Sequence, residues 1–343
     1  MHYSLSEIRA IPMLFIVGKG RSGTTLLSTI LDSHPQVASA TESRFLLILW
    51  QKYKTLKKWE PSKAEEFIAD VLLDLRIKHL WDFHDAFSEN LKNLPSETRV
   101  QDLIKLVYLQ RKSTFPKEKI KFIVDKNPMY TLFVERLAQI FPEAKFYRLV
   151  RDPRDNIASH IKYSKNEVGM LAYKWLRYNQ CLEKVSKNLP QQFFTQRFED
   201  LIMDKSAFFR EFEDYTEIDE LIEHESKRVL FKNKLQSKMN KRLKDQHQAS
   251  VKPLDRSKIG HFKEKLSDSQ IEVIEGICFP FAEIHGYRAE PKQSILVKRK
   301  WKRKYNLQQN LSLLFYSAPF WLIKFVSKKI VKKISYQEAN PQT

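Results

Sequence analysis

Short apolar runs recur along the chain between longer amphipathic stretches. A buried strand of a parallel sheet has this length and continuous hydrophobicity. Residues 11–17 (IPMLFIV) form such a continuous run, and the further strand candidates are residues 121–124 (KFIV), 145–150 (KFYRLV) and 192–198.

The stretches between these runs have helical spacing of apolar residues. We expect helices over residues 26–31, 42–53, 130–141 and 168–188, several helices over 62–115, and mainly helix up to about 288 with a loop at 250–261. Strands that alternate with helices indicate a parallel sheet covered on both faces. The predicted fold is therefore α/β, with three layers around a central parallel sheet as in P-loop proteins, and a helical insertion near residues 42–118.

The first predicted strand leads directly into the loop GKGRSGTT, residues 18–25, and then into a helix. Glycines allow successive N–H groups to face one anion, and the helix N-terminus favours negative charge. The ATPase pattern GxxxxGK[ST] has a lysine where this chain has Thr24, which argues against an ATPase or nucleotide kinase. The structural alternative is an ordinary glycine- and serine-rich turn.

A second candidate phosphate site lies in VRDPRDNIASH. Arg151 follows a predicted strand, and Ser159 comes about two turns into the next helix. An arginine matches phosphate oxygens with two parallel hydrogen bonds. Asp152, Arg154 and Asp155 are instead interpreted as local ion pairs at the start of the helix.

Three sequence blocks resemble the sulfotransferases, a branch of the P-loop fold. The first two, RSGTTLLSTILDSHPQVASATESRF and DKNPMYTLFVERLAQIFPEAKFYRLVRDPRDNIASH, are most similar to tyrosylprotein sulfotransferases and their bacterial relatives. SVKPLDRSKIGHF is similar to their C-terminal cofactor loop. The resemblance spans roughly residues 11–288.

This resemblance implies transfer of a sulfuryl group from 3′-phosphoadenosine 5′-phosphosulfate (PAPS) to an acceptor hydroxyl, without a metal. Glu42 matches the general base, Lys126 stabilises the leaving oxygen, and Arg151 with Ser159 binds the 3′-phosphate. Arg21 is the natural cation for the sulfuryl oxygens. The residues that we expect to bind the donor are Gly20, Arg21, Ser22, Gly23, Thr24, Thr25, Arg151, Ser159 and Lys258.

Several alternatives remain open. Glu42 alone fits a carboxylate at a helix start, and Lys126 alone fits a solvated loop lysine. Arg44 is a candidate for orienting Glu42 or the acceptor. His34 and His160 are alternative bases, ranked below Glu42.

The loop at residues 252–261 is rich in cations and is a candidate to close over the nucleotide. Its spacing is shorter than in the tyrosylprotein pattern, so the match of Lys258 to the family's lysine is not one-to-one. Ser250 is a further candidate ligand.

Charge separates the end of the chain from the rest. The net charge is +19, and the segment between Glu290 and Glu338 holds 12 Lys and Arg and no acid. Residues 311–326 are apolar apart from Ser312, Ser317, Pro319 and Lys324, too short a run to span a bilayer. We expect a catalytic domain over 1–290 and a basic amphipathic tail over 291–343.

The tail fits a helix lying on an anionic membrane surface, or a final helix packed on the body. No nucleic acid is expected as a partner.

The two cysteines, Cys181 and Cys278, allow one disulfide at most, and the N-terminus lacks the layout of a signal peptide. We therefore expect a cytoplasmic protein, peripheral to the membrane if the tail binds it, whose acceptor is a sugar, a lipid or a peptide. The rival functions are a P-loop kinase or ATPase and a non-catalytic membrane-surface protein.

Overall fold

The computed structural model describes residues 2–161, 163–164, 166–231, 252–289 and 297–326. The chain divides into two compact units. One comprises residues 1–11, 42–113 and 308–343, and the other comprises residues 12–41 and 114–307. Each unit is described by itself.

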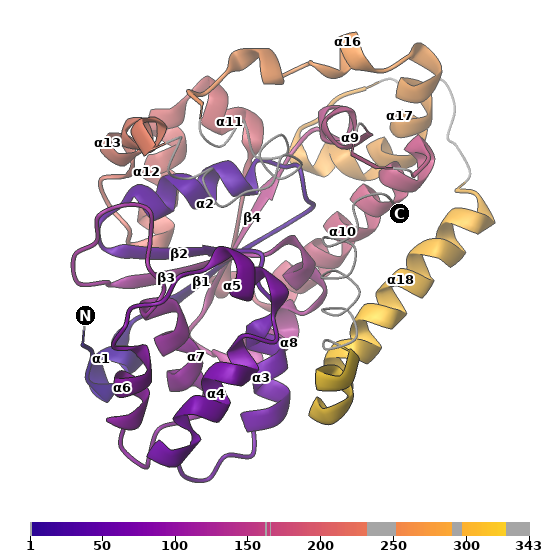
Figure 1. Ribbon diagram of the computed structural model, residues 1–343. Coiled ribbons are helices and arrows are strands. Elements are labelled where there is room, and N and C mark those ends of the chain that lie inside the picture. Colours follow the sequence, from indigo (N-terminus) through magenta and orange to yellow (C-terminus); the bar gives the residue numbers. More distant parts are fainter. Residues whose placement is uncertain (1, 162, 165, 232–251, 290–296, 327–343) are drawn as a thin grey trace, which may run out of the picture. The chain divides into compact units, whose positions relative to one another are not determined.

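The second unit is built on a parallel sheet of five strands (Figure 1). Their order is β2-β3-β1-β4-β5, which makes β1 the central strand. The strands are β1 (Met13–Val17), β2 (Val37–Thr41), β3 (Phe122–Lys126), β4 (Lys145–Val150) and β5 (Phe193–Arg197). The predicted α/β fold with a central parallel sheet is confirmed.

Helices cover both faces of this sheet. On one face, Leu14 and Leu149 pack against residues of α2, α11, α12 and α13. On the other face, Phe15 contacts Tyr130 and Phe141, with ring centroids 6.0 and 6.1 Å apart. The helices of this unit are α2 (Thr24–Ser33), α8 (Val134–Ile140), α9 (Pro153–Ile161), α10 (Val168–Asn188), α11 (Phe198–Met203), α12 (Lys205–Thr216), α13 (Leu221–Lys227), α16 (Phe262–Lys265) and α17 (Asp268–Ala282).

In the first unit, the predicted insertion consists of helices joined by loops. Its buried aromatic side chains contact one another: the ring of Phe45 lies 5.0 Å from that of Tyr108, and Trp59 lies 5.8 Å from Phe67. The helices are α1 (Leu5–Ala10), α3 (Phe45–Tyr53), α4 (Ala64–Val71), α5 (Leu75–Leu80), α6 (Phe87–Lys92) and α7 (Val100–Leu109). Helix α18 (Arg299–Ser317) begins in the second unit and ends in the first.

The structure differs from the prediction in one missed strand and two predicted helices. The segment Val37–Thr41 is a strand that the sequence analysis missed, and the helix expected from residue 42 begins at Phe45. Strand β2 pairs with β3 in parallel, so pairing across the sheet overrides the weak strand signal of the short, small-residue sequence VASAT. The predicted helix over 130–141 is a 3-10 turn followed by α8.

Candidate functional site

The loop at residues 18–25 joins β1 to α2, and its backbone requires glycine at two points. Gly18 has φ 134° and Gly23 has φ 88°, a left-handed region that favours glycine. A Cβ atom on Gly23 would lie 2.3 Å from the ring of Phe198. Gly23 is also the N-cap of α2, so the loop's tight turn brings backbone N–H groups to a helix N-terminus.

Side chains from neighbouring elements fix this loop. The Nδ2 group of Asn156, on α9, donates to the carbonyl oxygen of Gly20 at 3.1 Å and to Ser22 Oγ at 3.0 Å. The N–H of Gly18 donates to Thr131 Oγ1 at 3.1 Å. The sequence analysis named neither Asn156 nor Thr131. Their only signal was that each stands inside a block resembling the sulfotransferases.

Lys126 lies beside the loop because β3 pairs with β1. Its side chain is fully buried, and its Nζ donates to Thr25 Oγ1 at 3.0 Å. The solvated-lysine alternative for Lys126 is therefore excluded. The structure brings this predicted catalytic lysine together with a predicted donor ligand.

Arg21 and Ser159 are in direct contact, although 138 positions separate them. Arg21 Nε donates to Ser159 Oγ at 3.2 Å. Arg21 has a left-handed backbone, with φ 75°, and its guanidinium lies 5.3 Å from the ring centre of Tyr163. The first predicted phosphate site thus adjoins the second.

Arg151 links the loop to the later cation-rich segment. It is 7% exposed, and its two terminal nitrogens donate to the carbonyl oxygens of Arg21 (3.3 Å) and Lys258 (2.7 Å). Its Nε is buried without a partner in the described structure. Burial lowers the pKa of Arg151, while Asp155, Glu199 and Asp152 oppose that shift. A buried guanidinium with a spare donor is suited to an anionic ligand.

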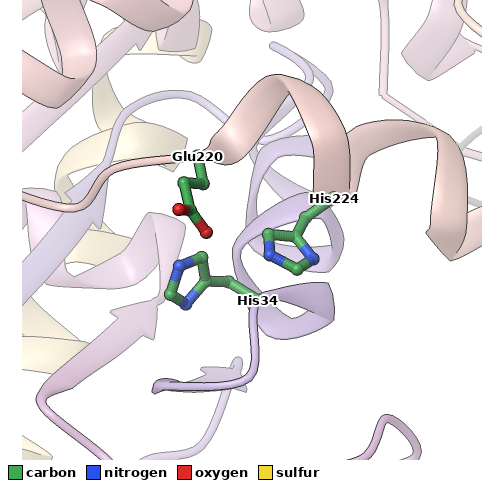
Figure 2. Close-up of side chains that lie close together, drawn as sticks. All are labelled: His34, Glu220 and His224. Carbon is green, nitrogen blue, oxygen red and sulfur yellow. The ribbon is translucent and has the colours of Figure 1, made fainter.

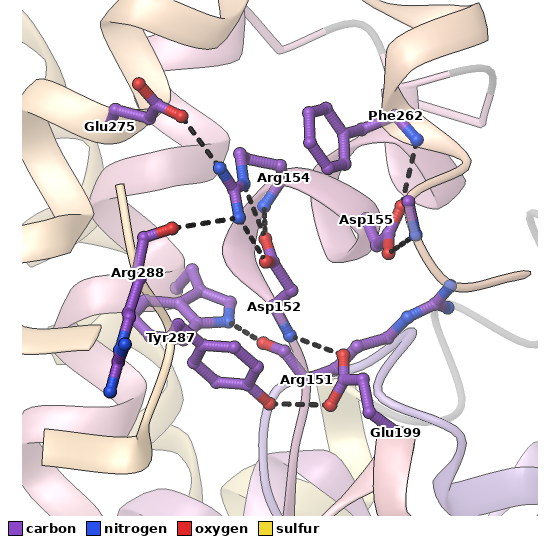
Figure 3. Close-up of polar contacts among 11 residues, drawn as sticks. Arg151, Asp152, Arg154, Asp155, Glu199, Phe262, Glu275, Tyr287 and Arg288 are labelled. Atoms are coloured by element: carbon purple, nitrogen blue, oxygen red, sulfur yellow. Dashed lines mark hydrogen bonds and ion pairs between the residues drawn. The ribbon is translucent and has the colours of Figure 1, made fainter. Parts of the chain in front are cut away.

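The acidic side chains near Arg151 form hydrogen bonds and ion pairs with other groups, as Figure 3 shows. Asp152 pairs with Arg154 at 2.7 Å, and Arg154 also pairs with Glu275 at 2.8 Å. Glu199 accepts hydrogen bonds from the N–H of Asp152 and from the hydroxyl of Tyr287, at 3.0 and 2.8 Å. The local ion-pair interpretation holds for Asp152 and Arg154.

Asp155 has a different role from the predicted ion pair. Its two carboxylate oxygens accept from the backbone N–H groups of Gly260 and Phe262, at 2.8 and 2.9 Å (Figure 3). Asp155 therefore holds the segment that follows Lys258. Hydrogen bonds to backbone amides are invisible in a sequence pattern.

Lys258 contacts Arg151 through its backbone and not through its side chain. Its carbonyl oxygen accepts from Arg151, but its Nζ pairs with Asp255 at 3.0 Å on the surface. The predicted loop does approach the second phosphate site, and its lysine side chain is engaged elsewhere. Ser250 lies outside the described residues.

Glu42 belongs to the first unit and follows β2 directly. Its backbone is left-handed, with φ 40°, and its carboxylate forms an ion pair with Arg76 of α5. The N–H of Arg44 donates to the carboxylate of Asp74. The sequence analysis proposed Arg44 as the residue that orients Glu42, and it did not name Arg76.

His34 lies in a separate cluster with His224 and Glu220 (Figure 2). One ligand-capable atom from each lies within 4.8 Å of the others. However, the N–H of Gln36 donates to His34 Nδ1 at 3.1 Å, so the proton of the neutral ring is on Nε2. A protonated nitrogen cannot ligate a metal, and this geometry favours a hydrogen bond from His34 to a nearby carboxylate.

His160 is not suited to act as a base. Its Nδ1 contacts the Nζ of Lys19 at 3.1 Å. Burial, together with the charges of Lys19, Arg21 and Lys174, lowers the pKa of His160 to about 3. A base with so low a pKa accepts a hydroxyl proton poorly at neutral pH.

Comparisons with known proteins bear on the family of the chain. A family model described as "Sulfotransferase family" matches residues 12–222, well over half of the chain. Protein-tyrosine sulfotransferase 1 of Danio rerio is 28% identical over 192 residues, which cover 52% of this chain and 47% of that protein. Protein-tyrosine sulfotransferase 1 of Homo sapiens is 27% identical over 177 residues, covering 51% and 40%. The matches span about half or less of the length of these relatives.

Among solved structures, the sulfotransferase domain from the Synechococcus PCC 7002 olefin synthase aligns with 81% of this chain and 96% of its own, at 18% identity and a TM-score of 0.49.

Proposed function

Because the chain belongs to the sulfotransferase family, we propose that it transfers a sulfuryl group from PAPS to an acceptor hydroxyl. The observation that supports this most is the hydrogen bond from Arg21 to Ser159. It joins the phosphate loop to the residues expected to bind a 3′-phosphate. PAPS carries a phosphosulfate at its 5′ position and a phosphate at its 3′ position, so it requires two adjoining anion sites.

In this proposal the loop from Gly20 to Thr25 and the N-terminus of α2 bind the 5′-phosphosulfate. Arg151 and Ser159 bind the 3′-phosphate, and the buried, unpartnered Nε of Arg151 supports that assignment. Such fixed donors stabilise charge without reorganising during the reaction.

The transfer itself requires a base, a cation for the sulfuryl oxygens and a cation for the leaving group. Glu42 takes the proton of the acceptor hydroxyl as its oxygen bonds to sulfur. The bond from sulfur to the bridging phosphate oxygen breaks, and the products are a sulfate ester and 3′-phosphoadenosine 5′-phosphate (PAP). Arg21 neutralises the sulfuryl oxygens, and Lys126 neutralises the leaving phosphate.

The proposal is tested by thermal unfolding with PAP, Mg-ATP or adenosine 5′-phosphosulfate. A ligand that binds only the folded state adds about 2.7 kcal/mol of stability at 100 times its dissociation constant. Stabilisation by PAP alone, independent of magnesium, is the expected result. Stabilisation only by Mg-ATP would instead favour a P-loop kinase or ATPase.

The acceptor is proposed to be a hydroxyl of a peptide, a sugar or a lipid. The names of the relatives specify protein tyrosine for those proteins, which supports tyrosine as one candidate here. Assay of radiolabelled sulfuryl transfer to tyrosine peptides, glycans and lipid extracts separates the three classes.

Membrane contact by the tail is a second proposal. None of the helices in the described part of the chain combines the length and hydrophobicity needed to cross a bilayer. Within the first unit, Leu311, Leu314, Trp321 and Phe325 are each more than half exposed. Exposed apolar side chains next to a lysine- and arginine-rich segment are typical of a helix at an anionic membrane surface. The cytoplasmic location stays a prediction, as do the domain boundaries at residue 290.

A further inference from the structure

Lys19, the second residue of the phosphate loop, is buried in the second unit. It is 5% exposed, and its Nζ lies 3.1 Å from Nδ1 of His160, in the last turn of α9. The pKa of His160 is lowered to about 3, so its ring is neutral at pH 7 and its Nδ1 can accept a hydrogen bond from charged Lys19. Lys19 was not among the residues that the sequence analysis selected.

The charges around Lys19 are of one sign. Burial first, and then the charges of Lys174 and Arg21, lower the pKa of Lys19 to about 7. The half-buried Lys174 has its own pKa lowered by burial and by Lys304. Among the described residues, every charged group that shifts the pKa of Lys19, His160 or Lys174 is a cation.

Helix α18 contributes Lys304 through its first turns, which pack on α10. Trp301 donates to the carboxylate of Glu167 at 3.0 Å, and the ring of Tyr305 lies 5.4 Å from that of Tyr173. These contacts belong to the second unit. The start of the basic segment therefore adds a cation to this cluster.

A buried lysine beside other cations loses its proton easily, as the lowered pKa of Lys19 indicates, and a bound anion stabilises the charged form. The terminal nitrogens of Arg151 bond the carbonyls of Arg21 and Lys258, which leaves its Nε for the donor, and Lys126 bonds Thr25. The side chain of Lys19 reaches α9 instead, where the one hydrogen-bond partner of its Nζ among the described residues is the neutral ring of His160.

We propose that Lys19, Lys174 and His160 form a subsite for an anionic group of the acceptor, so that the acceptor carries a sulfate, phosphate or carboxylate near the hydroxyl that is sulfated. This inference rests on the proposed sulfuryl transfer. Binding of the anion restores charge balance around Lys19 and replaces the weak contact with His160 by charge-assisted hydrogen bonds.

The test uses the full chain saturated with PAPS in the absence of acceptor, which fills the sulfuryl position beside Arg21. Inorganic phosphate is then titrated by calorimetry at constant ionic strength. Wild type binds phosphate, and Lys19→Met binds it about tenfold more weakly or not at all, while its affinity for PAP stays within about threefold of wild type. Lys174→Met is a second variant at a less buried position, and thermal unfolding with PAP verifies that each variant is folded.

Lys184→Met, an exposed lysine of the same helix α10, is the matched control and should bind phosphate as wild type does. Unchanged phosphate binding in both Lys19→Met and Lys174→Met would overturn the subsite. A tenfold loss of PAP affinity in Lys19→Met would overturn it too, since Lys19 would then belong to the donor. Failure of wild type to bind PAP at all would instead refute the proposed function.

Discussion

The guanidinium of Arg151 donates a hydrogen bond to the backbone carbonyl of Arg21, at 3.3 Å. One residue of the predicted 3′-phosphate site therefore helps to shape the loop proposed to bind the 5′-phosphosulfate.

Replacement of Arg151 by alanine should weaken PAP binding by about 30-fold or more, because a buried charged hydrogen-bonding group is lost. Isothermal calorimetry with PAP measures the effect. Arg288→Ala is the control, since its side chain is exposed and only its backbone carbonyl contacts Arg154. Equal losses in the two variants would contradict the 3′-phosphate assignment.

Replacement of Glu42 by glutamine should lower the transfer rate by about 10²- to 10⁴-fold, the usual contribution of a general base. PAP affinity should stay near that of wild type, because the donor does not need this carboxylate. Single-turnover transfer measured beside PAP calorimetry gives both quantities. A loss of PAP affinity as large as that of Arg151→Ala would remove Glu42 from the role of base.

We expect Arg76, the ion-pair partner of Glu42, to affect the transfer rate by positioning the Glu42 carboxylate. Arg76→Ala frees the Glu42 side chain, so kcat should fall by about tenfold while the KM for PAPS stays constant. Arg76→Lys should recover part of the rate. If the KM for PAPS rose and kcat did not change, Arg76 would act in donor binding instead.

Gly23→Ala should reduce the free energy of unfolding by about 2 kcal/mol or more, because alanine at φ 88° is strained and its Cβ overlaps the ring of Phe198. Gly20→Ala is the control, since nothing lies within 4 Å of the added Cβ. Urea unfolding compares the two. Equal stability would show that the loop avoids the clash by moving.

Acid should destabilise the second unit. His34 is buried beside His224, and its pKa falls from 6.5 to about 4. Between about pH 6.5 and pH 4 the unfolded chain binds the proton and the folded chain does not. Stability is therefore lost as the pH falls through that window, by up to about 1.4 kcal/mol per pH unit for each such histidine. Burial also lowers the pKa of His285.

Urea unfolding at pH 7 and pH 5 measures this loss, and His34→Gln should show a smaller one. If the stability of His34→Gln fell between pH 7 and pH 5 as steeply as that of wild type, His34 would be excluded as a cause of the acid destabilisation.

Charge at the exposed apolar positions should detach the protein from anionic vesicles. Leu314→Glu combined with Trp321→Glu should lower the bound fraction in sedimentation with phosphatidylserine vesicles by about tenfold or more. Met203→Glu changes another exposed apolar side chain outside the tail and should not affect sedimentation. If the wild-type protein did not sediment with these vesicles, the membrane proposal would be contradicted and α18 would be a packed helix only.

Four strands and the loop could be predicted because they leave local signals: the continuous apolar run of β1, short stretches rich in apolar and aromatic residues for β3, β4 and β5, and a glycine pattern between strand and helix. Strand β2 could not, because VASAT is short and only its pairing with β3 makes it a strand. The contacts of Asn156, Arg76 and Asp155 join residues 34 to 136 positions apart. No sequence period encodes such contacts, so the sequence suggests candidate residues but does not reveal the groups that contact them.

The ring of Phe198 touches both phosphate sites: it is the obstacle that forces glycine at position 23, and it lies 4.5 Å below the guanidinium of Arg151. Phe198 comes directly after the edge strand β5, about 175 positions after the loop. Contacts between such distant segments form late, since loop-closure entropy opposes them. The proposed nucleotide site is thus completed only when β5 has paired with β4, and we expect a chain arrested before that step to hold the whole loop sequence without binding the proposed donor.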